Sequence, residues 1–271
     1  MSPRTERFRA RSLGGVALQA LHWGDPSRAV LVLLHGGGAN AHWWDHVAPA
    51  LAEEHHVVAL DFRGHGGSDY PDETPVGAFS DDLDALLEHL RAPDAALVGH
   101  SMGAHIALDR AARVSGTRAL ALVDLAWQAP QAARRAARRA LSLRLSYPSR
   151  EAALARFRFV PTAARAPESL RRAIAEHSLR QEANGRWGFA FDPRWFSLPY
   201  RKLPPLSRLE TPVLILRGAE SPLLEPAAAR GLAAELPRAE LAEVAGAGHH
   251  VHLEQPQAVI AALRRFLRQA R

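Results

Sequence analysis

Residues 95–114 read AALVGHSMGAHIALDRAARV, and this stretch decides the fold class. The apolar run Ala95–Val98 is typical of a buried strand, and Ala104–Val114 has a helical pattern. Between them stands Gly99-His100-Ser101-Met102-Gly103, a G-x-S-x-G sequence in the strand–turn–helix context of a nucleophile elbow. In such a turn the residues two before and two after the serine pack against each other and must be small. The turn points the Ser101 hydroxyl out of the sheet and aims a helix N-terminus at a developing anion.

Short β-rich runs alternate with helical patterns along most of the chain, which is typical of a mostly parallel sheet flanked by helices. Strands are expected at Val16–Trp23, Ala29–Leu34, Val57–Asp61, Ala95–Gly99, Ala119–Val123, Val213–Leu216 and Glu240–Val244, and helices at 42–53, 79–91, 102–114, 226–236 and 256–270. The sequence therefore predicts an α/β fold.

The alternation stops between about residues 126 and 205. Helical patterns there cover 131–145, 149–158 and 167–183, and the aromatic stretch Arg186–Phe196 follows. An insertion of this size is most simply a helical cap over the carboxyl ends of the strands, where such sheets bind ligands. We expect a core of residues 1–125 and 206–271 and a helical cap of residues 126–205.

The expected cap is rich in aromatic residues. It holds eight of the chain's 15 Phe and Trp residues, namely Trp127, Phe157, Phe159, Trp187, Phe189, Phe191, Trp195 and Phe196. Most are expected to pack the cap onto the sheet, and a few to line an apolar acyl or alcohol site.

The composition excludes several classes of protein. Hydrophobic residues make up 47% and charged residues 23% of the chain, the proportions of a globular protein. No apolar run approaches the roughly 20 residues of a membrane span, and no secretory signal is visible. We therefore expect a cytoplasmic protein without membrane contact. The absence of cysteine excludes disulfides, thiolate metal sites and a cysteine nucleophile.

The net charge of +6 invites a nucleic-acid interpretation, but no nucleic-acid partner is expected. The basic residues are 33 Arg and one Lys spread along the chain, without a zinc-finger or helix-turn-helix pattern. One dense cluster, Arg134, Arg135, Arg138 and Arg139, falls on a probable helix. It is interpreted as a solvated helix face, with a docking patch for an anionic partner as the alternative.

Two further motifs supply what a serine nucleophile needs. His35-Gly36-Gly37-Gly38 follows an expected strand, and the Gly37 amide is the candidate oxyanion donor beside that of Met102. Gly246-Ala247-Gly248-His249 follows the last strand, and His249 is the candidate base. With His250 and His252 it also forms an H-H-x-H cluster, but a metal site is disfavoured because no matching ligand pair occurs elsewhere.

These motifs together resemble the α/β-hydrolase fold superfamily, in the branch of small, cap-bearing serine hydrolases of the esterase and lactonase kind. The resemblance spans the chain: HGGG, DFRGHGGSDYP (Asp61–Pro71), GHSMG, Asp124, PVLILRG (Pro212–Gly218) and GAGHHVHLEQP (Gly246–Pro256). It implies the α/β-hydrolase fold and a Ser-His-acid triad, and it makes Arg63–Gly66 with Ser68 a scaffold loop beside the site.

The triad acid departs from the usual pattern of that family. Its common position, three residues after the glycine that ends the penultimate strand, holds Ser221. Asp124, which closes the strand after the elbow helix, is the favoured replacement, because some relatives supply the acid from there. Glu220 is the second candidate, and Glu225 or an absent acid remains open.

We therefore expect a cofactor-free and metal-free serine hydrolase that cleaves a small or medium carboxylic ester or lactone through an acyl-enzyme. One alternative keeps the triad for another reaction of the superfamily, such as C–C bond hydrolysis, perhydrolysis or peptide cleavage. Another is a ligand-binding receptor on the same fold. Dehalogenases and epoxide hydrolases are disfavoured because their nucleophile is an Asp. The oligomeric state stays open.

Overall fold

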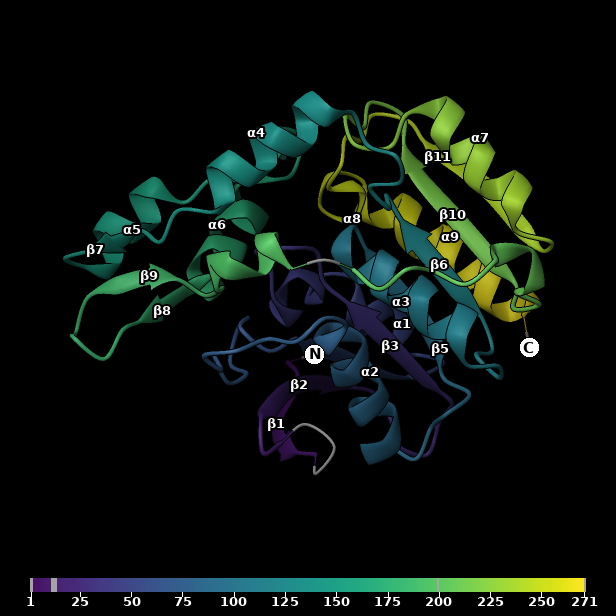
Figure 1. Cartoon of the computed structure of the whole chain (residues 1–271), viewed down its shortest axis with the longest axis horizontal. Helices are drawn as coiled ribbons and strands as arrows, with labels where there is room; N and C mark the ends of the chain where they lie inside the picture. Colours follow the sequence, from purple (N-terminus) through teal and green to yellow (C-terminus); the bar gives the residue numbers. More distant parts are fainter. Residues whose placement is uncertain (1, 11–13, 199, 271) are drawn as a thin grey trace.

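The computed structural model describes residues 2–10, 14–198 and 200–270. An eight-stranded sheet runs through it in the order β1-β2-β4-β3-β5-β6-β10-β11 (Figure 1). The strands are β1 (Arg4–Arg9), β2 (Ala17–Trp23), β3 (Val30–Leu34), β4 (His56–Asp61), β5 (Ala96–His100), β6 (Leu120–Val123), β10 (Val213–Gly218) and β11 (Ala239–Val244). Only β2 pairs antiparallel, with β1 and with β4. The other neighbours pair in parallel, which confirms the prediction of a mostly parallel sheet.

Helices cover both faces of this sheet. Those on one face are α2 (Ala78–His89), α3 (Met102–Arg113) and α7 (Pro226–Glu235), and those on the other are α1 (Ala48–Leu51) and α9 (Pro256–Gln269). Successive strand residues point to opposite faces, so Val32 and Leu34 pack on the first side and Leu31 and Leu33 on the second. Because both faces are covered, the central strands are apolar throughout and no alternation marks them.

Two predicted elements need correction. β1 (RTERFR) was not predicted, because it is an edge strand with one buried residue, Phe8, and carries no apolar pattern. The helix expected over 42–53 is two short pieces, η2 (Ala41–Trp44) and α1. Pro49 lies in the first turn of α1, where its missing N–H is tolerated; further inside a helix it would remove a hydrogen bond.

Between β6 and β10 the chain leaves the sheet and forms the inserted segment, residues 124–212, the teal and green elements at the upper left of Figure 1. Its elements are α4 (Gln131–Leu141), β7 (Ser146–Tyr147), α5 (Arg150–Arg156), α6 (Glu168–His177), β8 (Leu179–Gln181), β9 (Trp187–Phe189), η3 (Pro193–Ser197) and η4 (Leu206–Arg208).

The sequence predicts a purely helical inserted segment, but the structure also contains strands there. Its three strands form a small antiparallel sheet in the order β7-β9-β8. They are two or three residues long, too short for a periodic pattern to reveal. One signal was present: Asn184-Gly185 lies at the hairpin turn between β8 and β9, and Gly185 has a φ of +80°.

The helices of the inserted segment are shorter than predicted. Among them, helix α4 is the most exposed to solvent. None of its residues is buried, and all four arginines of the predicted cluster are exposed. This is what the solvated-face interpretation predicts. Across the described ranges, no helix has both the length and the apolar composition that crossing a membrane requires.

Aromatic packing joins the inserted segment to the core through two of the aromatic residues named above. Phe157 and Phe159 pack with Trp43 of η2 in a separate apolar cluster. The Trp43 indole also donates a hydrogen bond to the Ser178 hydroxyl (3.2 Å). The segment is thus fastened beside the carboxyl ends of the parallel strands, where the predicted site residues lie.

Candidate active site

Ser101 stands directly after β5 and before α3, in a strained turn. Its φ and ψ are 51° and −111°, a left-handed conformation that side chains rarely adopt. A Cβ on Gly99 would lie 2.3 Å from the Gly103 carbonyl oxygen, and one on Gly103 would lie 2.5 Å from that of Leu34. The steric prediction is confirmed, since the turn closes only because these two positions lack side chains.

Three residues far apart in the sequence meet at this turn. The Nε2 atom of His249 lies 3.0 Å from the Ser101 Oγ, and its Nδ1 lies 2.7 Å from the Asp124 Oδ2. His249 and Asp124 are buried and Ser101 is half-buried. The three side chains therefore form a continuous hydrogen-bonded chain from carboxylate to hydroxyl.

Asp124 is held by groups from the neighbouring strand β10 and the loop after it. The Gly218 amide donates to its Oδ1 (2.9 Å), and the Ser221 hydroxyl donates to its Oδ2 (2.5 Å). Sequence reasoning missed this role of Ser221. The signal was that Ser221 occupies the position where the family usually carries its acid, within reach of the same histidine.

The other candidate acids face elsewhere. Glu220 pairs with Arg165 (2.6 Å), with about half of its side chain exposed. Glu225 is exposed at the N-terminus of α7. Neither side chain contacts His249 in the described structure.

The glycine loop lies beside Ser101. A Cβ on Gly36 would lie 3.4 Å from the Ser101 Cβ, so the loop runs next to the serine side chain. Within the described ranges, neither the Gly37 nor the Met102 amide donates to a protein acceptor. Buried Asp61 holds the start of η2, which follows the glycine loop, because it accepts from the Ala41 amide (2.7 Å), and it also accepts from the Gly67 amide (2.9 Å).

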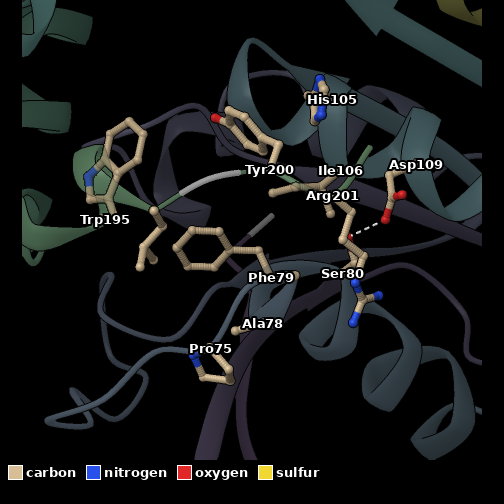
Figure 2. A pocket seen from close by; sticks show the side chains of 12 residues that line it. Pro75, Ala78, Phe79, Ser80, His105, Ile106, Asp109, Trp195, Tyr200 and Arg201 are labelled. Carbon is tan, nitrogen blue, oxygen red and sulfur yellow. Dashed lines mark hydrogen bonds between the residues drawn. The ribbon is translucent and has the colours of Figure 1, made fainter. Parts of the chain in front are cut away.

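Trp195 of η3 is a second residue that sequence reasoning left unassigned. A Cβ on Gly37 would lie 2.0 Å from its Cη2 atom, so the indole lies directly against the glycine loop. Trp195 also lines a cavity of about 20 Å³ with Phe79, Ile106 and Leu198 (Figure 2). One wall of the cavity is polar, where the Ser80 hydroxyl donates to Asp109 (2.5 Å).

The three histidines of the H-H-x-H cluster pack around His100, whose ring centroid lies 4.8 Å from that of His249, 5.5 Å from that of His250 and 4.5 Å from that of His252. The ring of His250 donates to the Pro161 carbonyl (2.8 Å), and His252 stacks on Trp44. His100 donates to the His249 carbonyl (2.9 Å) and so positions the loop that carries His249. No group of metal-ligand atoms found among the described residues includes His249, His250 or His252.

We expect the folded protein to lose stability as the pH falls from 7 to 5. Burial lowers the pKa of His65 to about 4 and that of His250 to about 3, whereas both titrate near pH 6.5 in the unfolded chain. The unfolded chain then binds more protons below about pH 6.5, so acid favours unfolding until the folded-state pKa is reached. Each histidine should cost about 2 kcal/mol between pH 7 and pH 5.

Thermal unfolding at pH 7, 6 and 5 measures this effect. The variant His250→Gln keeps a side-chain donor for the Pro161 carbonyl and should show a smaller pH dependence than the parent. A melting temperature that stays constant from pH 7 to pH 5 would contradict the assignment of neutral buried histidines.

Comparison with known proteins agrees with this geometry. The family model described as "Alpha/beta hydrolase family" matches residues 31–262. The chain belongs to the alpha/beta hydrolase family. The chain is 30% identical to Esterase Rv0045c of Mycobacterium tuberculosis, over 98% of this chain and 89% of the relative. It is also 30% identical to 3-oxoadipate enol-lactonase 2 of Acinetobacter baylyi, over 93% of this chain and 94% of the relative.

A solved hydrolase structure has the same fold. The crystal structure of E-2-(acetamidomethylene)succinate hydrolase superposes with a TM-score of 0.85 over 98% of this chain and 99% of that one, at 24% identity. The predicted fold and its esterase and lactonase branch are confirmed, and with them the prediction of a hydrolase that acts on ester bonds.

Proposed function

We propose that this alpha/beta hydrolase is a serine enzyme that cleaves a small or medium carboxylic ester or lactone through an acyl-enzyme, without a cofactor. The observation that carries the proposal is the hydrogen-bonded chain from Asp124 through His249 to Ser101. Each group has the partner that its role requires, and the serine is at the elbow between strand and helix. The esterase and lactonase relatives support this substrate class.

The chemistry proceeds in two steps. The Ser101 Oγ attacks the carbonyl carbon while the His249 Nε2 takes its proton, and Asp124 holds the ring and stabilises its positive charge. The C–O bond of the ester breaks, and the leaving alkoxide takes that proton from His249. Water, deprotonated by His249, then attacks the acyl carbon, which releases the acid and restores the Ser101 hydroxyl.

The negative oxygen that forms in each step needs preorganised donors. The Gly37 and Met102 amides are the proposed oxyanion hole, supported by their lack of protein acceptors and by the contact of the glycine loop with the serine turn. Met102 begins α3, whose N-terminus carries partial positive charge that favours the same anion.

Residues 126–205 are the proposed cap over a core of residues 1–125 and 206–271, and the cap shapes the substrate site. This is supported by the contact of Trp195 with Gly37 and by the bond from Trp43 to Ser178. A small-molecule ester is the proposed partner, which the esterase and lactonase relatives support.

Hydrolysis of p-nitrophenyl esters of increasing acyl length, with lactones and a C–C bond substrate in parallel, tests the proposal. We expect turnover of short esters or lactones by the parent enzyme and none by Ser101→Ala. Turnover of the C–C substrate alone would favour the other chemistry of the superfamily. Binding of esters without turnover would indicate a receptor.

Trp195→Ala is expected to shift selectivity toward longer acyl chains. Removal of the indole from Gly37 joins the adjacent cavity to the space above Ser101. Each additional buried methylene contributes about 0.8 kcal/mol, so two should raise kcat/KM for the longer ester about tenfold relative to acetate.

The ratio of kcat/KM for hexanoate and butyrate esters to that for acetate measures this shift. Trp187→Ala, which removes an indole from β9 and leaves Trp195 in place, is the matched control and should keep the parent ratio. An unchanged ratio in Trp195→Ala would show that the indole does not limit acyl length.

A further inference from the structure

Three side chains with metal-ligand atoms meet where the inserted segment contacts the core. His42 belongs to η2, Asp45 follows η2, and His177 is the last residue of α6. The His42 Nδ1 lies 2.9 Å from the Asp45 Oδ2, and the rings of His42 and His177 stack with centroids 3.8 Å apart. One ligand atom from each of the three lies within 4.8 Å of the others. None of these residues belongs to the proposed triad.

One oxygen of this cluster lacks a hydrogen-bond partner among the described residues. The second carboxylate oxygen of Asp45, Oδ1, is buried and has no hydrogen-bond partner among the described residues. A buried oxygen without a donor is costly, and a cation would satisfy it.

The backbone around both histidines is already held in place by buried Asn40. Its side-chain oxygen accepts from the His42 amide (3.1 Å), and its side-chain nitrogen donates to the His177 carbonyl (3.0 Å). The next residue on each side is fixed as well, because the Trp43 indole donates to Ser178. A metal site needs ligands on rigid supports, and one amide here supports two of them.

Rotation of the three side chains is the only change needed to bring their ligand atoms to coordination distance. Two ligands about 2.1 Å from a tetrahedral ion lie about 3.4 Å apart, and the three ligand atoms here already lie within 4.8 Å of one another. His177 is exposed, so its ring has room to turn without disturbing the core.

We propose that His42, Asp45 and His177 bind a divalent transition-metal ion such as Zn²⁺, with water completing the coordination. Two imidazole nitrogens and one carboxylate suit Zn²⁺, Ni²⁺ or Co²⁺, whereas Mg²⁺ and Ca²⁺ prefer oxygen ligands alone. The ion joins the end of α6 to η2, and η2 follows the glycine loop after Ala39 and Asn40. Metal binding therefore fastens the inserted segment to the part of the core that carries the proposed oxyanion donor.

Calorimetric titration of the untagged full-length protein with Zn²⁺, and visible absorption with Co²⁺, test the site directly. We expect one ion per chain, no comparable binding of Mg²⁺, and a melting temperature raised by about 5 °C at a hundredfold excess over Kd. His177→Ala, an exposed position whose loss should not unfold the chain, should weaken binding at least about tenfold. Asp45→Asn should weaken binding as well.

Two controls separate this site from other histidines. Ser101→Ala and His249→Ala should bind Zn²⁺ like the parent, because neither residue is a ligand. His89→Ala, which removes a different histidine–carboxylate pair formed with Glu6 (2.8 Å), should also leave binding unchanged. The proposal is overturned by the absence of one-to-one binding, by binding that survives His177→Ala, or by binding lost only in His89→Ala or His249→Ala.

Discussion

Ser101→Ala is expected to lower kcat by about 10⁶, the loss found when the nucleophile of a Ser-His-Asp enzyme is removed. In the proposed mechanism this hydroxyl attacks the substrate, and the Nε2 of His249 lies 3.0 Å from it, placed to take its proton. No neighbouring group in the described structure replaces this hydroxyl. The variant therefore keeps only the electrostatic stabilisation that the site gives to the transition state. Ester hydrolysis under saturating substrate and labelling by a fluorophosphonate probe both measure the loss.

Ser80→Ala is the matched control for this experiment. Ser80 is a buried serine whose hydroxyl donates to a carboxylate, Asp109, and no histidine nitrogen lies within hydrogen-bond distance of that hydroxyl in the described structure. We expect Ser80→Ala to keep both labelling and turnover. Labelling that persists in Ser101→Ala, in a protein with the parent's circular dichroism, would refute the nucleophile.

Asp124→Asn is expected to lower kcat by about 10⁴ while the fold is kept. The carboxylate accepts at Oδ2 from both the His249 ring and the Ser221 hydroxyl, and at Oδ1 from the Gly218 amide. An amide has one acceptor oxygen and one donor nitrogen. It cannot satisfy all three donors, and it favours the wrong tautomer of His249. Steady-state kinetics at the pH of maximum activity measures the loss.

Glu220→Gln is the comparison that separates the two candidate acids. Its carboxylate forms a half-exposed ion pair with Arg165, and such pairs contribute at most about 1 kcal/mol. We expect activity within about twofold of the parent. A large loss in Glu220→Gln, together with near-normal turnover in Asp124→Asn, would assign the acid to the other strand end.

The sequence alone was sufficient to predict those features that depend only on the backbone or burial of one short segment. Gly99 and Gly103 are needed because a strand must turn into a helix within a few residues, so the elbow is visible as a short motif. The apolar runs of β3 and β5 likewise indicate buried parallel strands, because both faces of such strands are covered. Nucleophile and base could both be proposed from such segments.

The triad acid could only be ranked from the sequence, because its position depends on which strands are neighbours. Asp124 reaches His249 because β6 pairs with β10, which brings Gly218 and Ser221 to the same carboxylate. Glu220 is one residue before Ser221 and turns toward Arg165 instead. No local pattern specifies that pairing, since it is set by packing across the whole sheet.

The contacts of the inserted segment with the core could not be predicted from the sequence either, because they too depend on packing between distant elements. Nothing near Trp195 indicates that its ring lies against Gly37, and nothing near His177 indicates that it stacks on His42. These pairs are 158 and 135 residues apart in the chain, and each depends on how the segment docks onto the core. The sequence determined the fold family and pointed to the proposed nucleophile and base, because local backbone geometry requires particular amino acids. Tertiary structure decided the acid, the wall beside the glycine loop and the histidine pair, because packing between distant elements leaves no local sequence pattern.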